Sequence, residues 1–169
     1  MNDRMALAER QLDRVQSFFP RVDTKVTAVA AWLSVEVAIA ALNTKIGDLG
    51  MAYVWVPFAV YVLTSAVSIA YVWQCLFPDP KGGQGSLIYF GAIASRTEGS
   101  FRNEFKAATE SELLDDLIGQ IWRNSEIVCA KYAAVQSAIR WATASLAALV
   151  AVVLATSILH KALPSFPGG

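Results

Sequence analysis

The sequence predicts an all-α membrane protein with three transmembrane helices and a small cytoplasmic helical subdomain, whose third span is continuous with a long cytoplasmic helix. Composition is the first observation: 55% of the 169 residues are hydrophobic and 17% are charged, whereas about a quarter of a soluble domain is charged. Second, the hydrophobic residues are concentrated in three long runs. Third, Thr109 and Glu112 form a capping box, and no proline follows before Pro164. Too little chain remains outside the runs for a large soluble core.

The first 44 residues predict a cytoplasmic N-terminal helix, residues 1–25, and a first span, residues 26–44. The N-terminal segment mixes apolar and charged side chains at helical spacing and is expected to end its helix near Pro20. Glu36 is the charged residue of the first span, and a carboxyl in hydrocarbon is expected in its neutral form. We expect Glu36 either to bond a hydroxyl or indole of a neighbouring helix or subunit, or to act in conduction or gating of the membrane.

A short turn leads into the second span, residues 51–77. Trp55 and Trp73 are ~27 Å apart along a helix, which matches the hydrocarbon thickness and predicts two aromatic belts. Proline and glycine then mark a loop over residues 78–86. Residues 87–94 are apolar but too short to span a bilayer, so we expect them to pack against the long helix. A further short helix is predicted over residues 100–108.

The long helix is predicted from Thr109 to about His160, a length of ~75 Å at 1.5 Å per residue. Its first half, to Arg140, has apolar side chains at helical spacing on one side and charged side chains on the other. Residues 141–160 form the third span, and residues 161–169 form an external tail. The cytoplasmic helical segment therefore extends over residues 78–140. An alanine stripe in the third span fits packing within one subunit or between subunits equally well.

Basic residues predict the orientation of the spans. They are frequent before residue 26 and between residues 78 and 140, whereas the turn between the first two spans has only Lys45. The positive-inside rule then places the N-terminus and residues 78–140 in the cytoplasm and the C-terminus outside. This distribution predicts a multi-pass membrane protein with a cytoplasmic N-terminus.

The sequence lacks the residues of a recognisable reaction site. It contains one histidine, His160, and neither of its two cysteines has metal-ligand spacing. We therefore expect no enzyme activity, no catalytic residues, no metal site and no cofactor. Fourteen basic residues balance fourteen acidic ones, so overall charge does not predict a nucleic-acid partner.

The cytoplasmic segment does carry residue types that suit a small anionic ligand. Cations can meet a phosphate, aromatic rings can stack on a base, and amides or hydroxyls can read the edge of the base. In that order the residues are Arg96 and Lys131; Tyr89, Phe90, Trp122 and Tyr132; and Gln120, Asn124 and Ser125. Gln120, Asn124 and Lys131 fall on one flank of the long helix, roughly 20 to 40° apart in projection. The alternative is that this flank is simply solvated.

Several short sequences, in their order relative to the spans, resemble the transmembrane effector family of Pycsar antiphage systems. The resemblance extends from about Arg21 to the third span. Its residues are Asp23-Thr24-Lys25 before the first span, then Leu87-Ile88-Tyr89-Phe90-Gly91 with Ile93-Ala94, and finally Leu117, Gln120-Ile121, Ser125-Glu126-Ile127 and Lys131-Tyr132 before the third span.

The resemblance implies a membrane effector whose cytoplasmic part senses cyclic CMP or cyclic UMP made by a partner pyrimidine cyclase. The implied output is impairment of the inner membrane and abortive infection, carried out by a homo-oligomer in the lipid bilayer. The matched residues carried over as candidate ligand contacts are Asp23, Lys25, Tyr89, Lys131 and Tyr132. The resemblance says nothing about Glu36. Two alternatives remain open: a structural or holin-like membrane protein that needs no nucleotide, and a membrane anchor for a soluble partner.

Overall fold

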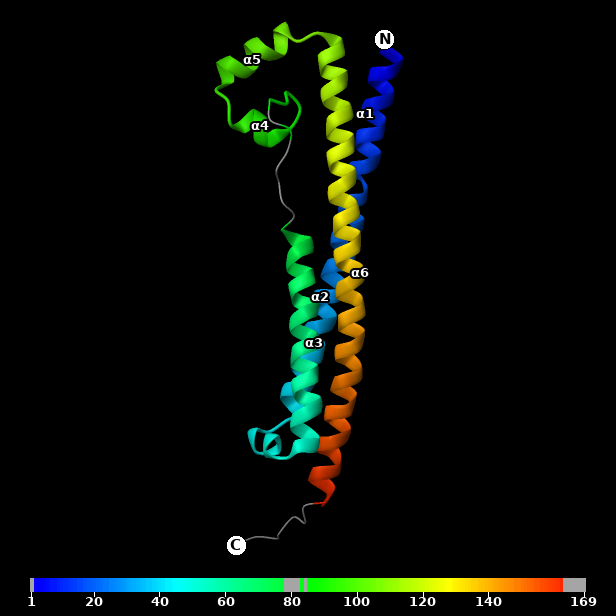
Figure 1. Ribbon diagram of the computed structural model, residues 1–169, viewed down its shortest axis with the longest axis vertical. Helices are drawn as coiled ribbons and strands as arrows, with labels where there is room; N and C mark the ends of the chain where they lie inside the picture. Colours follow the sequence, from blue (N-terminus) through cyan, green and yellow to red (C-terminus); the bar gives the residue numbers. More distant parts are fainter. Residues whose placement is uncertain (1, 78–82, 84, 163–169) are drawn as a thin grey trace. The chain divides into compact units, whose positions relative to one another are not determined.

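The computed structural model describes residues 2–77, 83 and 85–162, and its regular elements are helices (Figure 1). In chain order they are α1 (Asn2–Gln16), α2 (Phe18–Asn43), the 3-10 helix η1 (Ile46–Gly50), α3 (Ala52–Leu76), α4 (Phe90–Ala94), α5 (Glu98–Ala107) and α6 (Glu110–Ala162). The chain divides into two compact units. Unit 1 comprises the described residues of 1–23 and 77–132, and unit 2 those of 24–76 and 133–169.

The first span helix begins earlier than predicted. We expected the N-terminal helix to end near Pro20, but α1 ends at Gln16 and α2 starts at Phe18. Pro20 is therefore the third residue of α2. The first residues of a helix have no intrahelical partner for their N–H groups, so proline is tolerated there. Ser17, between the two helices, donates its backbone N–H to the Asp13 carbonyl at 2.9 Å.

In unit 1, the predicted capping box opens α6. The Thr109 backbone N–H donates to Glu112 Oε2 at 2.7 Å, and the Glu112 N–H donates to Thr109 Oγ1 at 3.3 Å. The bond from the Thr109 N–H lowers the pKa of the Glu112 carboxyl, with a second contribution from the Thr109 hydroxyl. The predicted helix over 100–108 is α5, and Thr97 caps it by accepting a bond from the Ser100 N–H.

The core of unit 1 joins α1 to the first half of α6. Ala8, Leu12 and Leu117 are buried together, and Ile88 packs against them. The expectation that residues 87–94 pack on the long helix is therefore confirmed for Ile88. Ala8 and Leu12 of α1 pack with Leu117 of α6, and Asp23, near the start of α2, pairs with Lys131 further along α6. The N-terminal helices therefore run in the same direction as α6 within this unit.

In unit 2, three helices pack along their length. Glu36 meets Ser145, and Ala40 packs with Leu149, so α2 and α6 run parallel. The Ser68 hydroxyl donates to the Ala138 carbonyl at 2.8 Å, whereas Tyr61 packs with Leu149, so α3 runs antiparallel to α6.

Buried positions on α6 follow a seven-residue repeat. In unit 2, Ala134 and Ala148 are buried beside a series that runs at alternating steps of three and four residues: Val135, Ala138, Ala142, Ser145, Leu149, Val152, Thr156 and Leu159. This spacing is that of a coiled-coil seam. Of the predicted alanine stripe, Ala148 is buried inside unit 2 whereas Ala144 and Ala151 are exposed.

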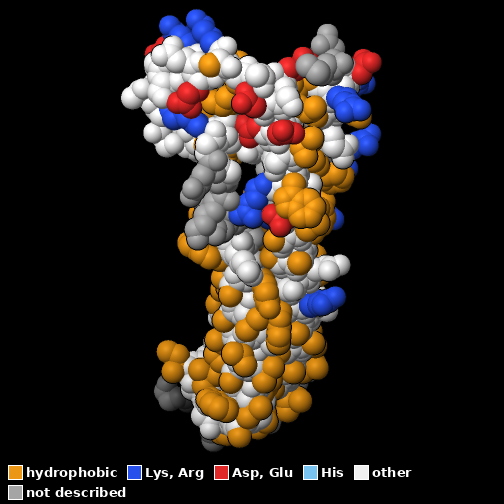
Figure 2. Space-filling view, turned by 45° about the horizontal axis from the view of Figure 1, so that its top comes forward, with side chains coloured by type: hydrophobic (Ala, Val, Ile, Leu, Met, Phe, Trp, Pro, Cys, Tyr) orange, Lys and Arg blue, Asp and Glu red, His pale blue; other side chains and the backbone are white. Residues whose placement is uncertain are grey.

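Within the described part of the chain, three helices are long and apolar enough to cross a membrane. The visible face of unit 2 is covered mainly by hydrophobic side chains, whereas charged side chains gather over unit 1 (Figure 2). The 25 residues of α3 extend about 37 Å at 1.5 Å per residue. The predicted fold class is confirmed, including the continuity of the third span with a long helix. Most of the predicted loop over residues 78–86 and the tail from 163 to 169 lie outside the described residues.

The turn between the first two spans is held by Asp48. Its Oδ2 accepts the Lys45 backbone N–H at 2.9 Å, and its Oδ1 lies 3.3 Å from His160 Nε2 of α6. The bond from the Lys45 N–H lowers the pKa of the Asp48 carboxyl. His160 therefore has an acidic partner at the end of the third span.

Candidate ligand site

A cavity of about 380 Å³ lies within unit 1. Its walls come from α1 and the start of α2, from the segment that leads into α4, and from α6. The lining residues are Leu12, Gln16, Phe19, Ile88, Tyr89, Phe90, Gln120 and Asn124. Four of these, Tyr89, Phe90, Gln120 and Asn124, are among the ligand contacts predicted from the sequence. The volume is within the range of small-molecule sites, about 300–1,000 Å³.

The two amides reach the cavity because polar residues occupy inward positions of α6. Leu117, Gln120 and Asn124 follow the same three-and-four spacing as the buried residues of unit 2. Gln120 is buried, and its Nε2 donates to Ser86 Oγ at 3.2 Å. Asn124 is half-buried one turn further on. The cavity therefore combines apolar and aromatic walls with two groups that can both donate and accept hydrogen bonds.

Lys131 lies beside this cavity. Its Nζ is 2.6 Å from Asp23 Oδ1 and 5.6 Å from the centroid of the Phe19 ring, which lines the cavity. The Lys131 side chain is 8% exposed, whereas that of Asp23 is 50% exposed. The ammonium is therefore held between a half-exposed carboxylate and an aromatic face.

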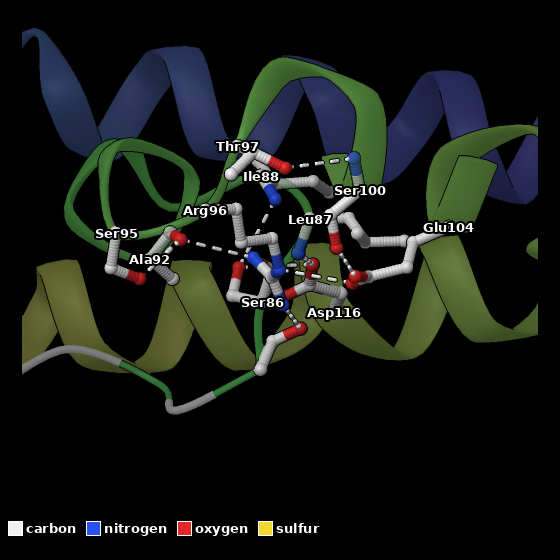
Figure 3. A network of polar contacts seen from close by, with 11 residues as sticks. Ser86, Leu87, Ile88, Ala92, Ser95, Arg96, Thr97, Ser100, Glu104 and Asp116 are labelled. Atoms are coloured by element: carbon white, nitrogen blue, oxygen red, sulfur yellow. Dashed lines mark hydrogen bonds and ion pairs between the residues drawn. The ribbon is translucent and has the colours of Figure 1, made fainter. Parts of the chain in front are cut away.

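Asp116 and Ser86 fix the segment that carries Tyr89 and Phe90 (Figure 3). Asp116 Oδ2 accepts the Leu87 backbone N–H at 2.7 Å and the Ser86 hydroxyl at 3.0 Å. Ser86 Oγ in turn accepts the backbone N–H of Tyr89 at 2.8 Å. The Tyr89 and Phe90 rings then lie 4.8 Å apart between centroids. Asp116 of α6 thus helps to position the Tyr89 and Phe90 rings that line the cavity.

Arg96 braces the same segment. Its Nη1 donates to the Ser86 carbonyl at 2.7 Å, its Nη2 donates to the Gly85 carbonyl at 2.7 Å, and its Nε lies 2.9 Å from Glu104 Oε2 (Figure 3). Arg96 also borders a second cavity of about 380 Å³, together with Tyr89. The sequence suggested Arg96 as a phosphate contact. In this structure its guanidinium binds protein carbonyls and a carboxylate.

The remaining predicted contacts lie outside the cavity lining. Tyr132 is half-buried next to Lys131 in the chain, and Lys25 is exposed on α2 in unit 2. Trp122 is 69% exposed, and the Ser125 hydroxyl donates to the Ile121 carbonyl at 2.7 Å. Glu36 belongs to unit 2, where its Oε2 lies 2.6 Å from the Ser145 hydroxyl oxygen.

Sequence reasoning missed Phe19, Ser86 and Asp116. Asp116 precedes Gln120 by four residues and therefore lies on the same flank of the long helix. That spacing was the signal that could have identified it. Among the described residues, no group of three or more His, Cys, Asp or Glu side chains is placed to hold a metal ion.

Comparison with known proteins adds the family. Residues 7–158 match the Pycsar effector protein domain, PycTM. The chain belongs to this family. Neither the curated proteins nor the solved structures gave a match. PycTM is a transmembrane effector domain of Pycsar antiphage defence and is not an enzyme family. Membership links the chain to a membrane and to a cyclic pyrimidine signal, and the predicted resemblance is confirmed.

Proposed function

We propose that this PycTM protein binds cyclic CMP or cyclic UMP in the unit 1 cavity and, once bound, impairs the bacterial inner membrane, which ends the infection by abortive death of the cell. The observation that carries the proposal is the cavity itself. It brings together Tyr89, Phe90, Gln120 and Asn124 from two separate stretches of sequence. Membership of a Pycsar effector family supplies the chemical class of the ligand.

The cavity lining suits a pyrimidine base. A base has a π-face, and the adjacent rings of Tyr89 and Phe90 offer it a stacking surface. Gln120 and Asn124 provide amide donors and acceptors for the polar edge of the base. Gln120 is already oriented by Ser86, so part of the cost of ordering the site is met before ligand binds.

Lys131 is the cation best placed for the cyclic phosphate. It touches the Phe19 ring of the cavity wall, and its present partner is a half-exposed carboxylate, Asp23. In this proposal the phosphate replaces Asp23 as the partner of Lys131. The bound state and the ligand-free state then differ in one ion pair, and this gives the nucleotide a differential affinity for the two states. Lys25 and Tyr132, next to these residues in the chain, complete the proposed juxtamembrane contact set.

In this proposal, the helices that continue into the membrane transmit the effect of nucleotide binding to the bilayer. Asp23 lies in α2 and Lys131 in α6, and each helix continues without a break into a span. A change of partner at these residues would be conveyed along two continuous helices. We propose that homo-oligomers perform this step, with the N-terminus and residues 78–140 in the cytoplasm, after a pyrimidine cyclase supplies the nucleotide.

Isothermal titration of the detergent-solubilised full chain tests the proposal, with cyclic CMP, cyclic UMP and cyclic AMP as ligands. We expect saturable binding of one pyrimidine nucleotide and no response to the purine. Asn124→Asp should abolish that binding because it places a carboxylate beside the anionic ligand. Asn103→Asp, the same change at an exposed position of α5, is the matched control. Absence of binding in folded protein would favour a membrane protein that needs no nucleotide.

A further inference from the structure

Glu36 is the most buried acidic or basic side chain among the described residues of unit 2. It is 1% exposed and lies near the middle of the predicted first span, where an ionised carboxylate is costly. Intramembrane carboxyl groups that persist at such positions commonly belong to ion pathways or proton relays. The contacts of Glu36 show which form of the carboxyl this structure accommodates.

The two oxygen contacts of the Ser145 hydroxyl indicate which form of the Glu36 carboxyl fits here. Ser145 Oγ lies 2.6 Å from Glu36 Oε2 and 2.8 Å from the Ala142 carbonyl oxygen. A hydroxyl has one proton and can donate to only one of these oxygens. Both contacts are satisfied if Ser145 donates to Ala142 and the protonated carboxyl of Glu36 donates to Ser145. The oxygen positions around Ser145 therefore suit a protonated Glu36.

Unit 2 also contains buried oxygen atoms that make no hydrogen bond. Among the described residues, four buried oxygen atoms have no hydrogen-bond partner: Glu36 Oε1, the Tyr61 hydroxyl, Ser65 Oγ and, in the first span as well, Thr44 Oγ1. Tyr61 and Ser65 are one turn apart on α3. Tyr61 interacts electrostatically with Glu36. Unsatisfied buried polar atoms are costly and call for an explanation.

The groups around Glu36 favour a proton over other ions. Tyr61 of α3 is a titratable group that interacts electrostatically with Glu36, whereas α6 contributes Ser145, which does not titrate in water. A metal cation needs several oxygen ligands at once, and no metal-binding cluster exists among the described residues. One carboxyl flanked by hydroxyls can take up and release a single proton.

We propose that Glu36 is a proton-binding site and that protons are the ions which the active effector passes across the membrane. The carboxylic acid releases its proton to water on one side, and the resulting carboxylate takes a proton from the other side. One proton crosses in each cycle, and nothing is oxidised or reduced. The proton flux rests on the proposed function, because it requires bound nucleotide. The protonation of Glu36 does not depend on the proposed function.

The first test needs no nucleotide. Dicyclohexylcarbodiimide is an apolar reagent that modifies protonated carboxyl groups inside membranes. Full-length protein in phosphatidylethanolamine and phosphatidylglycerol vesicles is treated at neutral pH, and its peptides are analysed by mass spectrometry. We expect one adduct on the peptide that contains Glu36 and none in Glu36→Gln. Unmodified Glu36 in folded protein would overturn the proposal.

The second test measures flux into the same vesicles, loaded with a pH-sensitive dye, after addition of the pyrimidine nucleotide. Glu36→Gln keeps the size of the side chain but cannot exchange a proton, and its flux should fall to that of protein-free vesicles. Glu36→Asp should retain flux, and so should the control Ser68→Ala, which removes another buried hydroxyl of unit 2. Wild-type flux in Glu36→Gln would overturn the proton route. If no nucleotide elicits flux from wild type, the sensing proposal fails, and the labelling result still decides the proton site.

Discussion

Lys131 is buried and Asp23 is half-exposed, yet their charged atoms lie 2.6 Å apart. This asymmetry makes the carboxylate the replaceable partner, since it regains hydration when the pair opens, whereas the ammonium does not. Under the proposed function, we expect the ligand phosphate to enter the cavity next to Phe19 and to replace Asp23 as the partner of Lys131.

Substitution of the two partners should change nucleotide affinity in opposite directions. Lys131→Gln removes the phosphate contact and should weaken binding about 10- to 100-fold, the value of a hydrogen bond to a charged group. Asp23→Asn removes the competitor and should tighten binding, at a cost of about 1–2 kcal/mol in stability. Titration calorimetry and thermal melts measure the two effects. Weaker binding in both variants would show that Asp23 contacts the ligand instead of competing with it.

Aromatic stacking should depend on Phe90 and not on Trp122. Both side chains are highly exposed, at 73% and 69%, so truncation of either should barely change stability. Only Phe90 lines the cavity among these two. Phe90→Ala should weaken nucleotide binding about tenfold, as expected for loss of one stacking partner, and Trp122→Ala should leave it unchanged. Equal losses in the two titrations would place the base elsewhere.

Arg96 should act on the cavity through the segment it braces. Arg96→Ala removes the donors to the carbonyls of Gly85 and Ser86 and should increase amide hydrogen exchange over residues 85–96. Arg96→Lys should restore little of the protection from exchange, because lysine lacks the planar set of donors that arginine offers to the two carbonyls. Arg102→Ala breaks only an exposed pair with Glu98 and should change stability by less than about 1 kcal/mol. Unchanged exchange in Arg96→Ala would contradict the bracing role.

The capping box should make stability depend on acid. The pKa of Glu112 is lowered in the folded protein, chiefly by the Thr109 N–H. The stability that the ionised Glu112 carboxyl contributes is therefore fully present above its unfolded-state pKa of about 4.3. It is lost as the pH falls through the lower pKa of the folded state. Thermal melts between neutral and acidic pH should show a smaller acid loss in Glu112→Gln than in wild type. Glu9→Gln, an exposed change on α1, should behave as wild type.

Local chemistry explains what the sequence could predict. The capping box, the apolar runs and the helical spacing of α6 each involve residues close together in the chain, and the structure confirms these features. The cavity was predicted in part, because Gln120 and Asn124 share one helix flank. Phe19 joins them only when α2 packs beside α6, and local spacing does not report such packing. Arg96 was assigned to a ligand because sequence alone does not place the carbonyls of residues 85 and 86 around it.

The bond between Glu36 and Ser145 also has a consequence for biogenesis. The two residues are 109 positions apart, so a ribosome releases the first span long before the third exists. The nascent α2 must leave the translocon with its carboxyl lacking the serine hydroxyl, at the usual insertion cost of about 2.5–3.5 kcal/mol for an acid at mid-membrane. Arrival of α6 completes the contact. Assembly of the bundle is therefore a late, post-insertional event governed by the last helix to be synthesised.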